Sequence, residues 1–191
     1  MNWPLMIVAM LPEHLLLAGI AVLIGLNVMQ VGEKHSGLVA FAAVAAAALI
    51  AVLLAIVQFA GSPFPGHFSV DPGTLAAKAV VLALALPLIQ MSRDEFGSDE
   101  RFYILLLSSL YGVLLVSSAD GFLTMFLGLE IMSMPVYVLV LIAYKRHEAA
   151  EAALKYLVLG GAATAMFLMG ASLVYGSTGS LRKPTPSLFG A

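Results

Sequence analysis

The stretch GFLTMFLGLEIMSMPVYVLVLIA, residues 121–143, is long enough and apolar enough to cross a lipid bilayer. It carries one charged residue, Glu130, near its middle. At about 1.5 Å per residue, Glu130 lies roughly 14 Å from the start of the run and close to the midplane of the membrane. A charge at that depth costs at least about 2.5 kcal/mol, so such residues usually line a hydrated path, a relay or a binding site. Ion or proton movement is therefore the leading functional hypothesis.

The rest of the chain has the same apolar character. The sequence of 191 residues is 61% hydrophobic and 10% charged, with a mean hydropathy of +1.01. Further runs long enough to span a membrane are Met6–Met29, Gly37–Phe59, Thr74–Met91, Phe102–Ser118 and Ala149–Tyr175. We therefore expect an all-α membrane protein, a polytopic bundle of about six transmembrane helices. Residues 1–181 form the single domain of this prediction, and residues 182–191 form a disordered tail.

The loops between these runs are short, and their charges predict an orientation. The first run lacks the basic start and the cleavage site of a signal peptide, which indicates a retained first helix. Six spans place both termini on one side of the membrane. The positive-inside rule then predicts that both termini lie outside the cytoplasm. The basic residues that support this are Lys34, Arg93, Arg101, Lys145 and Arg146 on one side, against Arg182 and Lys183 on the other.

Composition excludes several classes of function. The chain has no cysteine, which removes disulfides, thiolate metal sites and iron–sulfur ligation. A net charge of −2 without a basic cluster argues against nucleic acid as a partner. The four histidines are too scattered for a metal site by spacing, and no phosphate loop or nucleophile motif is present. We therefore expect neither a cofactor nor a metal on this chain.

Two readings are open for Glu130. In the functional reading, favoured because lone intramembrane acids are rarely kept for packing, its carboxyl group binds and releases a proton. In the other, a protonated Glu130 only donates a hydrogen bond to a neighbouring backbone carbonyl. Pro135 cannot donate to the carbonyl of Ile131, so the helix loses one hydrogen bond beside the acid. That freed carbonyl could hold water, although a simple kink is the preferred reading of the proline.

A second polar group lies in the last apolar run. Lys155 follows Glu151 by four residues and Glu148 by seven, so the three share one helix face, and Glu151 is a candidate ion-pair partner. Lys155 is either a member of a proton relay with Glu130 or a residue whose head reaches the lipid headgroups, and the sequence favours neither. Lys78, at the fifth position of its run, is interpreted as an interfacial residue that snorkels to the headgroups.

Three segments resemble a known family. FLGLEIMSMP (126–135), EAAEAALKY (148–156) and LVYGSTGSL (173–181) resemble, in order and separation, subunit N of the proton-pumping NADH:quinone oxidoreductase, complex I. The resemblance implies an antiporter-like subunit of the membrane arm. In that family the acid matching Glu130 takes part in proton translocation with a lysine on helix seven, and the lysine matching Lys155 belongs to the same polar axis.

The resemblance also implies partners and a location. NADH, FMN, iron–sulfur clusters and quinone are expected on partner subunits, and this chain is expected in a hetero-oligomer in the bacterial inner membrane. The family has about fourteen helices in inverted repeats, so six spans lead us to expect a truncated part of an antiporter-like fold. The alternatives are a subunit of a multisubunit monovalent cation/proton antiporter and an inactive truncated scaffold.

Overall fold

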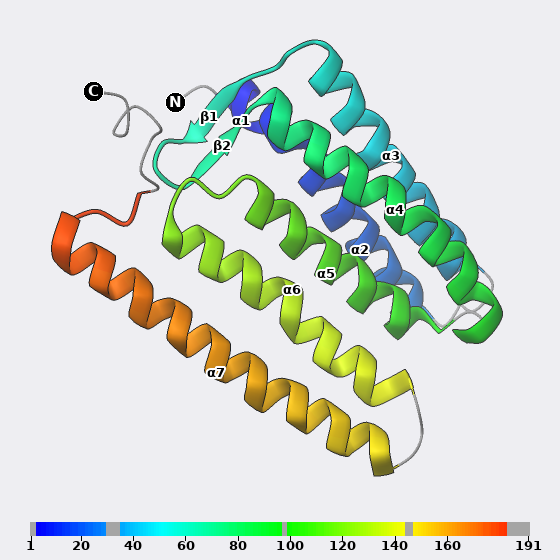
Figure 1. Cartoon of the computed structure of the whole chain (residues 1–191). Helices are drawn as coiled ribbons and strands as arrows, with labels where there is room; N and C mark the ends of the chain where they lie inside the picture. The colour runs from blue at the N-terminus through cyan, green and yellow to red at the C-terminus, as the bar shows by residue number, and fades with distance from the viewer. Residues whose placement is uncertain (1–2, 30–34, 97–98, 144–146, 183–191) are drawn as a thin grey trace.

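The computed structural model describes residues 3–29, 35–96, 99–143 and 147–182. Within these ranges, six helices are long and apolar enough to cross a membrane, so the predicted membrane-spanning helical bundle is confirmed. Figure 1 shows the helices arranged side by side, with a small hairpin at one end of the bundle. The elements are α1 (Trp3–Ala9), α2 (Leu11–Val28), α3 (Ser36–Ile56), β1 (Gly61–Phe64), β2 (Phe68–Val70), α4 (Pro72–Phe96), α5 (Glu100–Ser117), α6 (Phe122–Ala143) and α7 (His147–Thr178).

The first apolar run forms two helices, so the prediction of one helix over Met6–Met29 is wrong. The chain leaves helical geometry at Met10, which has φ −108° and ψ 18°, and α2 begins at the next residue. Pro12 lies in the first turn of α2, where a proline is well tolerated because its missing N–H is not needed there. The same missing N–H cannot bond to the carbonyl of Val8, which breaks the helix at this point.

The segment between α3 and α4, which the sequence analysis counted only among the short loops, forms an antiparallel hairpin. Gly61 pairs with Val70 and Phe64 with Phe68, and Gly66 turns the chain with a φ of +82°. The hairpin leads into α4, where the carboxylate of Asp71 accepts a hydrogen bond of 2.7 Å from the backbone N–H of Thr74. That contact is a helix cap, and it fixes where α4 begins.

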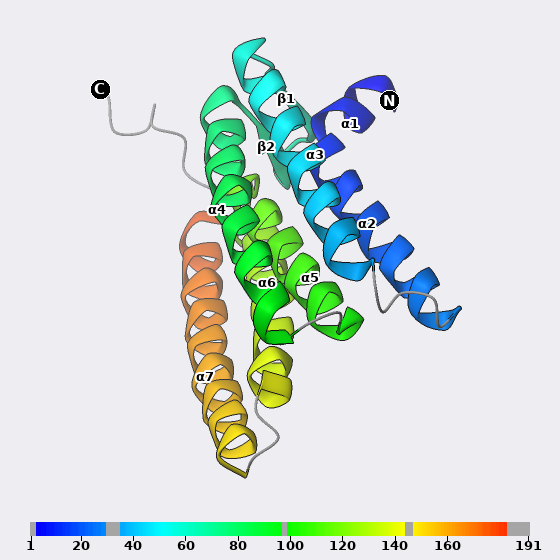
Figure 2. The same ribbon diagram turned by 90° about the vertical axis from the view of Figure 1, so that its right-hand side faces the viewer.

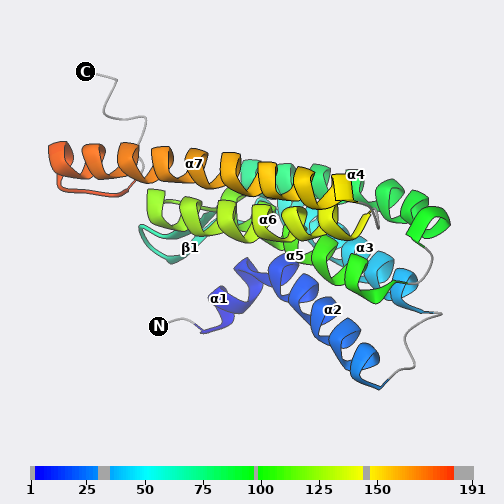
Figure 3. The same ribbon diagram turned by 90° about the horizontal axis from the view of Figure 1, so that it is seen from below.

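The core lies between α2, α3, α4 and α5. Its buried side chains include Leu23 of α2, Val44 of α3, Leu82 of α4 and Leu107 of α5. The spans of these four helices are 28%, 28%, 33% and 39% buried, whereas α6 is 6% and α7 is 0% buried. Helix α6 packs on α5, and α7 packs on α6. Figures 2 and 3 show α7 and α2 on opposite sides of the bundle.

Three connections meet at the hairpin end of the bundle. The carboxylate of Asp120, between α5 and α6, accepts a hydrogen bond of 3.1 Å from the backbone N–H of Gly66 in the hairpin. The same carboxylate forms an ion pair of 3.3 Å with Arg182, which follows α7. The backbone N–H of Phe122 donates to the carbonyl of Leu181 at 2.9 Å. These contacts fix the end of α7 against the start of α6.

The described ends of the chain, at α1 and after α7, lie together at the hairpin end (Figure 1). Arg93 near the end of α4 and Arg101 at the start of α5 belong to the opposite end of the bundle. The other basic residues used to predict the orientation, Lys34, Lys145, Arg146 and Lys183, lie outside the described residues. Arg182, the first residue of the predicted tail, is held by Asp120, and residues 183–191 also lie outside the described residues.

A pair of glycines in α2 tests the packing of α2 on α3. A Cβ atom on Gly19 would lie 2.6 Å from the Cβ of Ala43 in α3, whereas a Cβ on Gly25 would meet nothing within 4 Å. We expect Gly19→Ala to lower the stability of the bundle by about 1–3 kcal/mol, because α2 must move away from α3. Gly25→Ala, the matched control, should leave stability unchanged or raise it slightly.

The measurement is the midpoint of thermal unfolding of each variant in the same detergent. Equal midpoints for the two variants would contradict the close contact between α2 and α3.

Candidate functional site

Glu130 lies on α6, half-buried, in the part of the helix that packs on α5. Among the described residues, its carboxylate has no recorded hydrogen bond or ion pair. The hydroxyl of Ser109 on α5 donates to the carbonyl of Met132 at 3.0 Å, two residues along from Glu130. Pro135 lies inside α6 and cannot donate to the carbonyl of Ile131. The acid therefore lies beside backbone acceptors on a helix that contacts α5 directly.

Glycines bring α5 and α6 into backbone contact on both sides of Glu130. A Cβ on Gly112 of α5 would clash with the backbone nitrogen of Met132. A Cβ on Gly128 of α6 would lie 2.7 Å from a methyl group of Val116. Small residues permit this close approach of membrane helices. The depth and rotation of Glu130 are therefore set by the contact between α5 and α6.

Lys155 and Glu151 form an ion pair on α7, with 2.6 Å between Lys155 Nζ and Glu151 Oε1. Both side chains are exposed on this chain, at 69% and 66%. No ion pair between Glu130 and Lys155 is recorded in the described part of the chain. The structure therefore leaves the two predicted relay residues on neighbouring helices without direct contact. Their roles in a proton path stay predictions.

The packing of α7 on α6 depends on another glycine. The hydroxyl of Tyr137 on α6 occupies the place where a Cβ on Gly160 of α7 would be, whereas a Cβ on Gly161 would meet nothing within 4 Å. Gly160 thus fits α7 over a tyrosine side chain of α6. This contact sets how the Lys155 helix face is turned relative to Glu130.

Lys78 is fully buried, so its interpretation as a snorkelling interfacial residue is wrong. Its exposure is 0%, and its Nζ lies 2.5 Å from Glu13 Oε1 of α2, which is 1% exposed. A lysine can reach the headgroups only when its stem runs along the protein surface. Here the side chain points into the bundle because an acid 65 residues away in sequence accepts from it.

Other groups surround this buried ion pair. The Nζ atom of Lys78 lies 5.1 Å from the centre of the Phe68 ring in β2, a cation–π contact. Asp71 lies within electrostatic range of Lys78, and Tyr111 of α5 lies within electrostatic range of Glu13. The second carboxylate oxygen, Glu13 Oε2, is buried and has no hydrogen-bond partner among the described residues.

The sequence reading missed Glu13, although the signal was present. Glu13 is an acid inside the apolar run Met6–Met29, which is the same criterion that singled out Glu130. Glu13 is the eighth residue of that run, and a charge so near the start of a span lies closer to the membrane surface than Glu130 does. The break at Met10 starts a new helix at Leu11, and on that helix Glu13 faces Lys78 of α4 and is buried.

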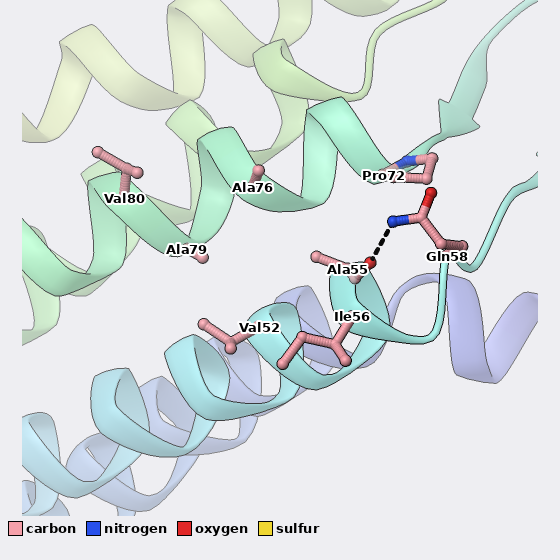
Figure 4. A pocket seen from close by; sticks show the side chains of 8 residues that line it. All are labelled: Val52, Ala55, Ile56, Gln58, Pro72, Ala76, Ala79 and Val80. Atoms are coloured by element: carbon pink, nitrogen blue, oxygen red, sulfur yellow. Dashed lines mark hydrogen bonds between the residues drawn. The ribbon is translucent and has the colours of Figure 1, made fainter.

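The described residues hold no group of three or more His, Cys, Asp or Glu side chains that could bind a metal ion. An apolar groove lies between the end of α3 and the start of α4 (Figure 4). Its polar side chain, Gln58, donates to the carbonyl of Ala55 at 3.1 Å. The other described residues that line the groove are apolar, so they give the groove no ionisable side chain. The ionisable residues of the spans are therefore the candidate site.

Comparison with known proteins identifies the fold and the relatives. Residues 119–188, which include Glu130, Glu151 and Lys155, match the family described as "NADH:quinone oxidoreductase/Mrp antiporter, TM". The NADH-quinone oxidoreductase subunit N of Pelobacter propionicus is 31% identical over 173 residues, which cover 90% of this chain and 37% of the relative. This chain is similar to NADH-quinone oxidoreductase subunit N over most of its own length.

Solved structures show the same relationship in three dimensions. A chain of respiratory complex I from Thermus thermophilus with bound aureothin matches with a TM-score of 0.79 and 30% identity, over 92% of this chain and 39% of that chain. A chain of the archaeal membrane-bound sulfane sulfur reductase matches with a TM-score of 0.79 and 25% identity, over 92% of this chain and 38% of that one. The predicted resemblance to subunit N and the antiporter-like fold are confirmed.

This chain spans 37% of the length of the subunit N of Pelobacter propionicus. The similarity covers both the acid-bearing α6 and the well-packed first part of the bundle, since it extends over 90% of this chain. The match therefore does not by itself assign the activity, substrates or partners of a whole subunit N to this chain.

The buried ion pair and the exposed ion pair give a matched test of burial. Lys78→Met leaves the Glu13 carboxylate buried without its cation, and we expect a loss of stability of about 3 kcal/mol or more. Lys155→Met removes an exposed ion pair and should cost much less. The measurement is the midpoint of thermal unfolding of the two variants in the same detergent. Shifts of equal size would contradict the burial of Lys78.

Neighbouring glycines test the contact between α6 and α7. Gly160→Ala places a methyl group on the Tyr137 hydroxyl, so α7 must shift or turn on α6. Gly161→Ala, one residue along, adds a methyl group in open space and is the matched control. We expect weaker chemical cross-linking between cysteines placed on α6 and α7 in the first variant only. Equal cross-linking in both variants would count against the contact.

Proposed function

We propose that this chain is a membrane-arm subunit of a proton-pumping NADH:quinone oxidoreductase and contributes to proton translocation coupled to electron transfer from NADH to quinone. The similarity to subunit N over 90% of the chain carries this proposal, together with the match to a complex I chain at a TM-score of 0.79. The segment that matches the family holds Glu130, Glu151 and Lys155, the predicted site residues.

Glu130 is the residue proposed to bind and release a proton. Its helix approaches α5 closely at Gly112 and Gly128, so the carboxyl group is held at one depth. The carbonyl of Ile131 receives no hydrogen bond from Pro135, which leaves an acceptor for a water molecule next to the acid. A carboxyl group beside such an acceptor can exchange a proton with water in a membrane interior.

We assign the next proton-exchanging position of the path, after Glu130, to Lys155 with Glu151. Glu151, the first residue of the pair, lies about 6 Å from the start of α7, which is at the end of the bundle opposite the hairpin. Glu130 lies about 12 Å from the start of α6, which is at the hairpin end. The exposed face of α7 would present the pair to neighbouring protein rather than to lipid, because charged side chains avoid hydrocarbon. The proposed path is therefore a proton relay between Glu130 and the Lys155 pair, which lie at different depths on adjacent helices.

The partners and the location belong to the same proposal. NADH, FMN, the iron–sulfur clusters and quinone are assigned to partner subunits, and this chain carries none of them. Its neighbours are other membrane-arm subunits in a hetero-oligomer of the bacterial inner membrane. The arginines Arg93 and Arg101 then lie on the cytoplasmic side, and the hairpin with the described ends of the chain lies on the other side.

The second candidate function is a subunit of a multisubunit monovalent cation/proton antiporter. The description of the matched family includes the Mrp antiporter, which favours this alternative. Purification of the chain from its native membrane separates the two proposals. Soluble flavin and iron–sulfur subunits in the preparation support the oxidoreductase, whereas antiporter subunits alone support the alternative. Insertion in the membrane with no effect of Glu130 or Lys155 substitutions on any flux would indicate an inactive scaffold.

The substitution Glu130→Gln tests the proposed role of the acid. It keeps the shape of the side chain but removes the proton-binding carboxylate, so we expect fewer protons pumped per NADH oxidised in membrane vesicles that contain the complex. Glu148→Gln, at an exposed position of the first turn of α7, is the matched control. Pumping is followed by a pH-sensitive dye and NADH oxidation by absorbance. A wild-type ratio in Glu130→Gln would refute the assigned role.

A further inference from the structure

The Glu13 and Lys78 pair is an ionisable site that the proposed path through Glu130 does not use. Both side chains lie in membrane spans, on α2 and α4, and both are buried at 1% and 0% exposure. Ionisable residues inside a membrane are costly and usually mark a path for ions or protons. The pair therefore calls for an explanation beyond packing.

Apolar layers enclose the pair along the helix axes. On α4, Leu75 and Leu82 lie three residues before and four residues after Lys78, on the same helix face, and both have 0% exposure. On α2, the buried Leu16 follows Glu13 by one turn, and Phe68 of the hairpin covers Lys78 from the other side. The pair is thus a small polar compartment between the hairpin and the main core.

The geometry of the pair does not suit a purely structural role, in which it would only hold α2 against α4. Replacing a buried ion pair by apolar side chains of similar volume is often neutral or stabilising, so packing alone does not require these charges. Glu13 Oε2 is also buried without a hydrogen-bond partner among the described residues, which is unfavourable for folding. A site built only to join α2 to α4 gains nothing from that unsatisfied oxygen, whereas a site that receives a proton needs a free acceptor.

We propose that Glu13 and Lys78 form a second proton-transfer pair of this chain. The N–H bond of the Lys78 ammonium breaks and an O–H bond forms on Glu13, which leaves a neutral amine and a neutral carboxylic acid. The amine then takes up a proton from the hairpin side and becomes an ammonium again. The carboxyl group then turns, so that the protonated oxygen leaves Lys78 and takes the place of the unpaired oxygen, where its O–H bond breaks and the proton is released. The carboxylate is restored, so one proton is taken up and one is released.

The charged and titratable groups around the pair fit this direction of transfer. Asp71, at the start of α4, lies within electrostatic range of Lys78 and belongs to the hairpin end of the bundle. Tyr111 of α5 lies within electrostatic range of Glu13 and is the neighbour in sequence of Gly112, which contacts α6 beside Glu130. The pair thus lies between the hairpin and α5, and α5 in turn packs on α6, the helix that carries Glu130.

This inference rests on the proposed function, and the test uses the complex that contains the chain. Lys78→Arg keeps a cation beside Glu13, but arginine does not give up its proton in proteins. Under a structural role, this variant pumps like the wild type. Under the inference, the number of protons pumped per NADH oxidised falls, while the amount of chain in the purified complex is unchanged.

The double variant Glu13→Leu/Lys78→Met is a second test, because the arginine in Lys78→Arg is larger than lysine and can disturb the packing by itself. It replaces the pair by apolar side chains of similar volume, so it should assemble, yet it has no group that can carry a proton. We expect a lowered pumping ratio here as well. A wild-type ratio in either variant overturns the inference, and so does failure of both variants to assemble, which would make the pair a structural lock.

Glu130→Gln, measured in the same vesicles, separates this inference from the proposed function. Lowered pumping in Glu130→Gln with normal pumping in the Lys78 variants refutes only the second pair. Normal pumping in Glu130→Gln with lowered pumping in the Lys78 variants refutes the role given to Glu130 and keeps the pair.

Discussion

Hydrocarbon offers no hydrogen-bond partners, and this constraint governs every polar group of the chain. The helices satisfy their own backbones, and serine or threonine hydroxyls inside them donate to carbonyls one turn back, as Ser108 does to Ile104 at 2.8 Å. Where the chain leaves helical geometry at the hairpin end, neighbouring segments bond to one another, as Asp120 does to the backbone of His67 at 3.0 Å. The same constraint forces an explanation for each charged side chain in a span.

Glu13 and Glu130 are two acids that meet this constraint in different ways. Glu13 faces a lysine from another helix, and only one of its oxygens is bonded. Glu130 has no recorded partner among the described residues and lies beside a carbonyl that Pro135 leaves free. The first arrangement places a charge next to its opposite, and the second places a carboxyl group next to a free backbone acceptor. Both are arrangements from which a proton can move, and neither improves packing.

Much of the fold could be predicted from the sequence, because the length and hydropathy of a span are local properties. The six spans were found in this way, and the FLGLE segment pointed to the correct relatives. The break at Met10 follows from Pro12, a local signal that the sequence analysis did not use, whereas the hairpin is also bonded to the distant segment around Ala119. The environment of Lys78 was predicted wrongly because its partner Glu13 is 65 residues away. Long-range pairing cannot be deduced from spacing along one helix.

The uneven burial of the spans has a consequence for how the protein is made. Helices α2 to α5 enclose the core, whereas α6 and α7 pack mainly on one neighbour each. Helices α2 to α5 are synthesised before α6 and α7, so the core can form in the bilayer before α6 and α7 emerge from the ribosome. The two helices that carry Glu130 and Lys155 then pack onto a core that has already formed, and the described part of the chain leaves their outward faces uncovered.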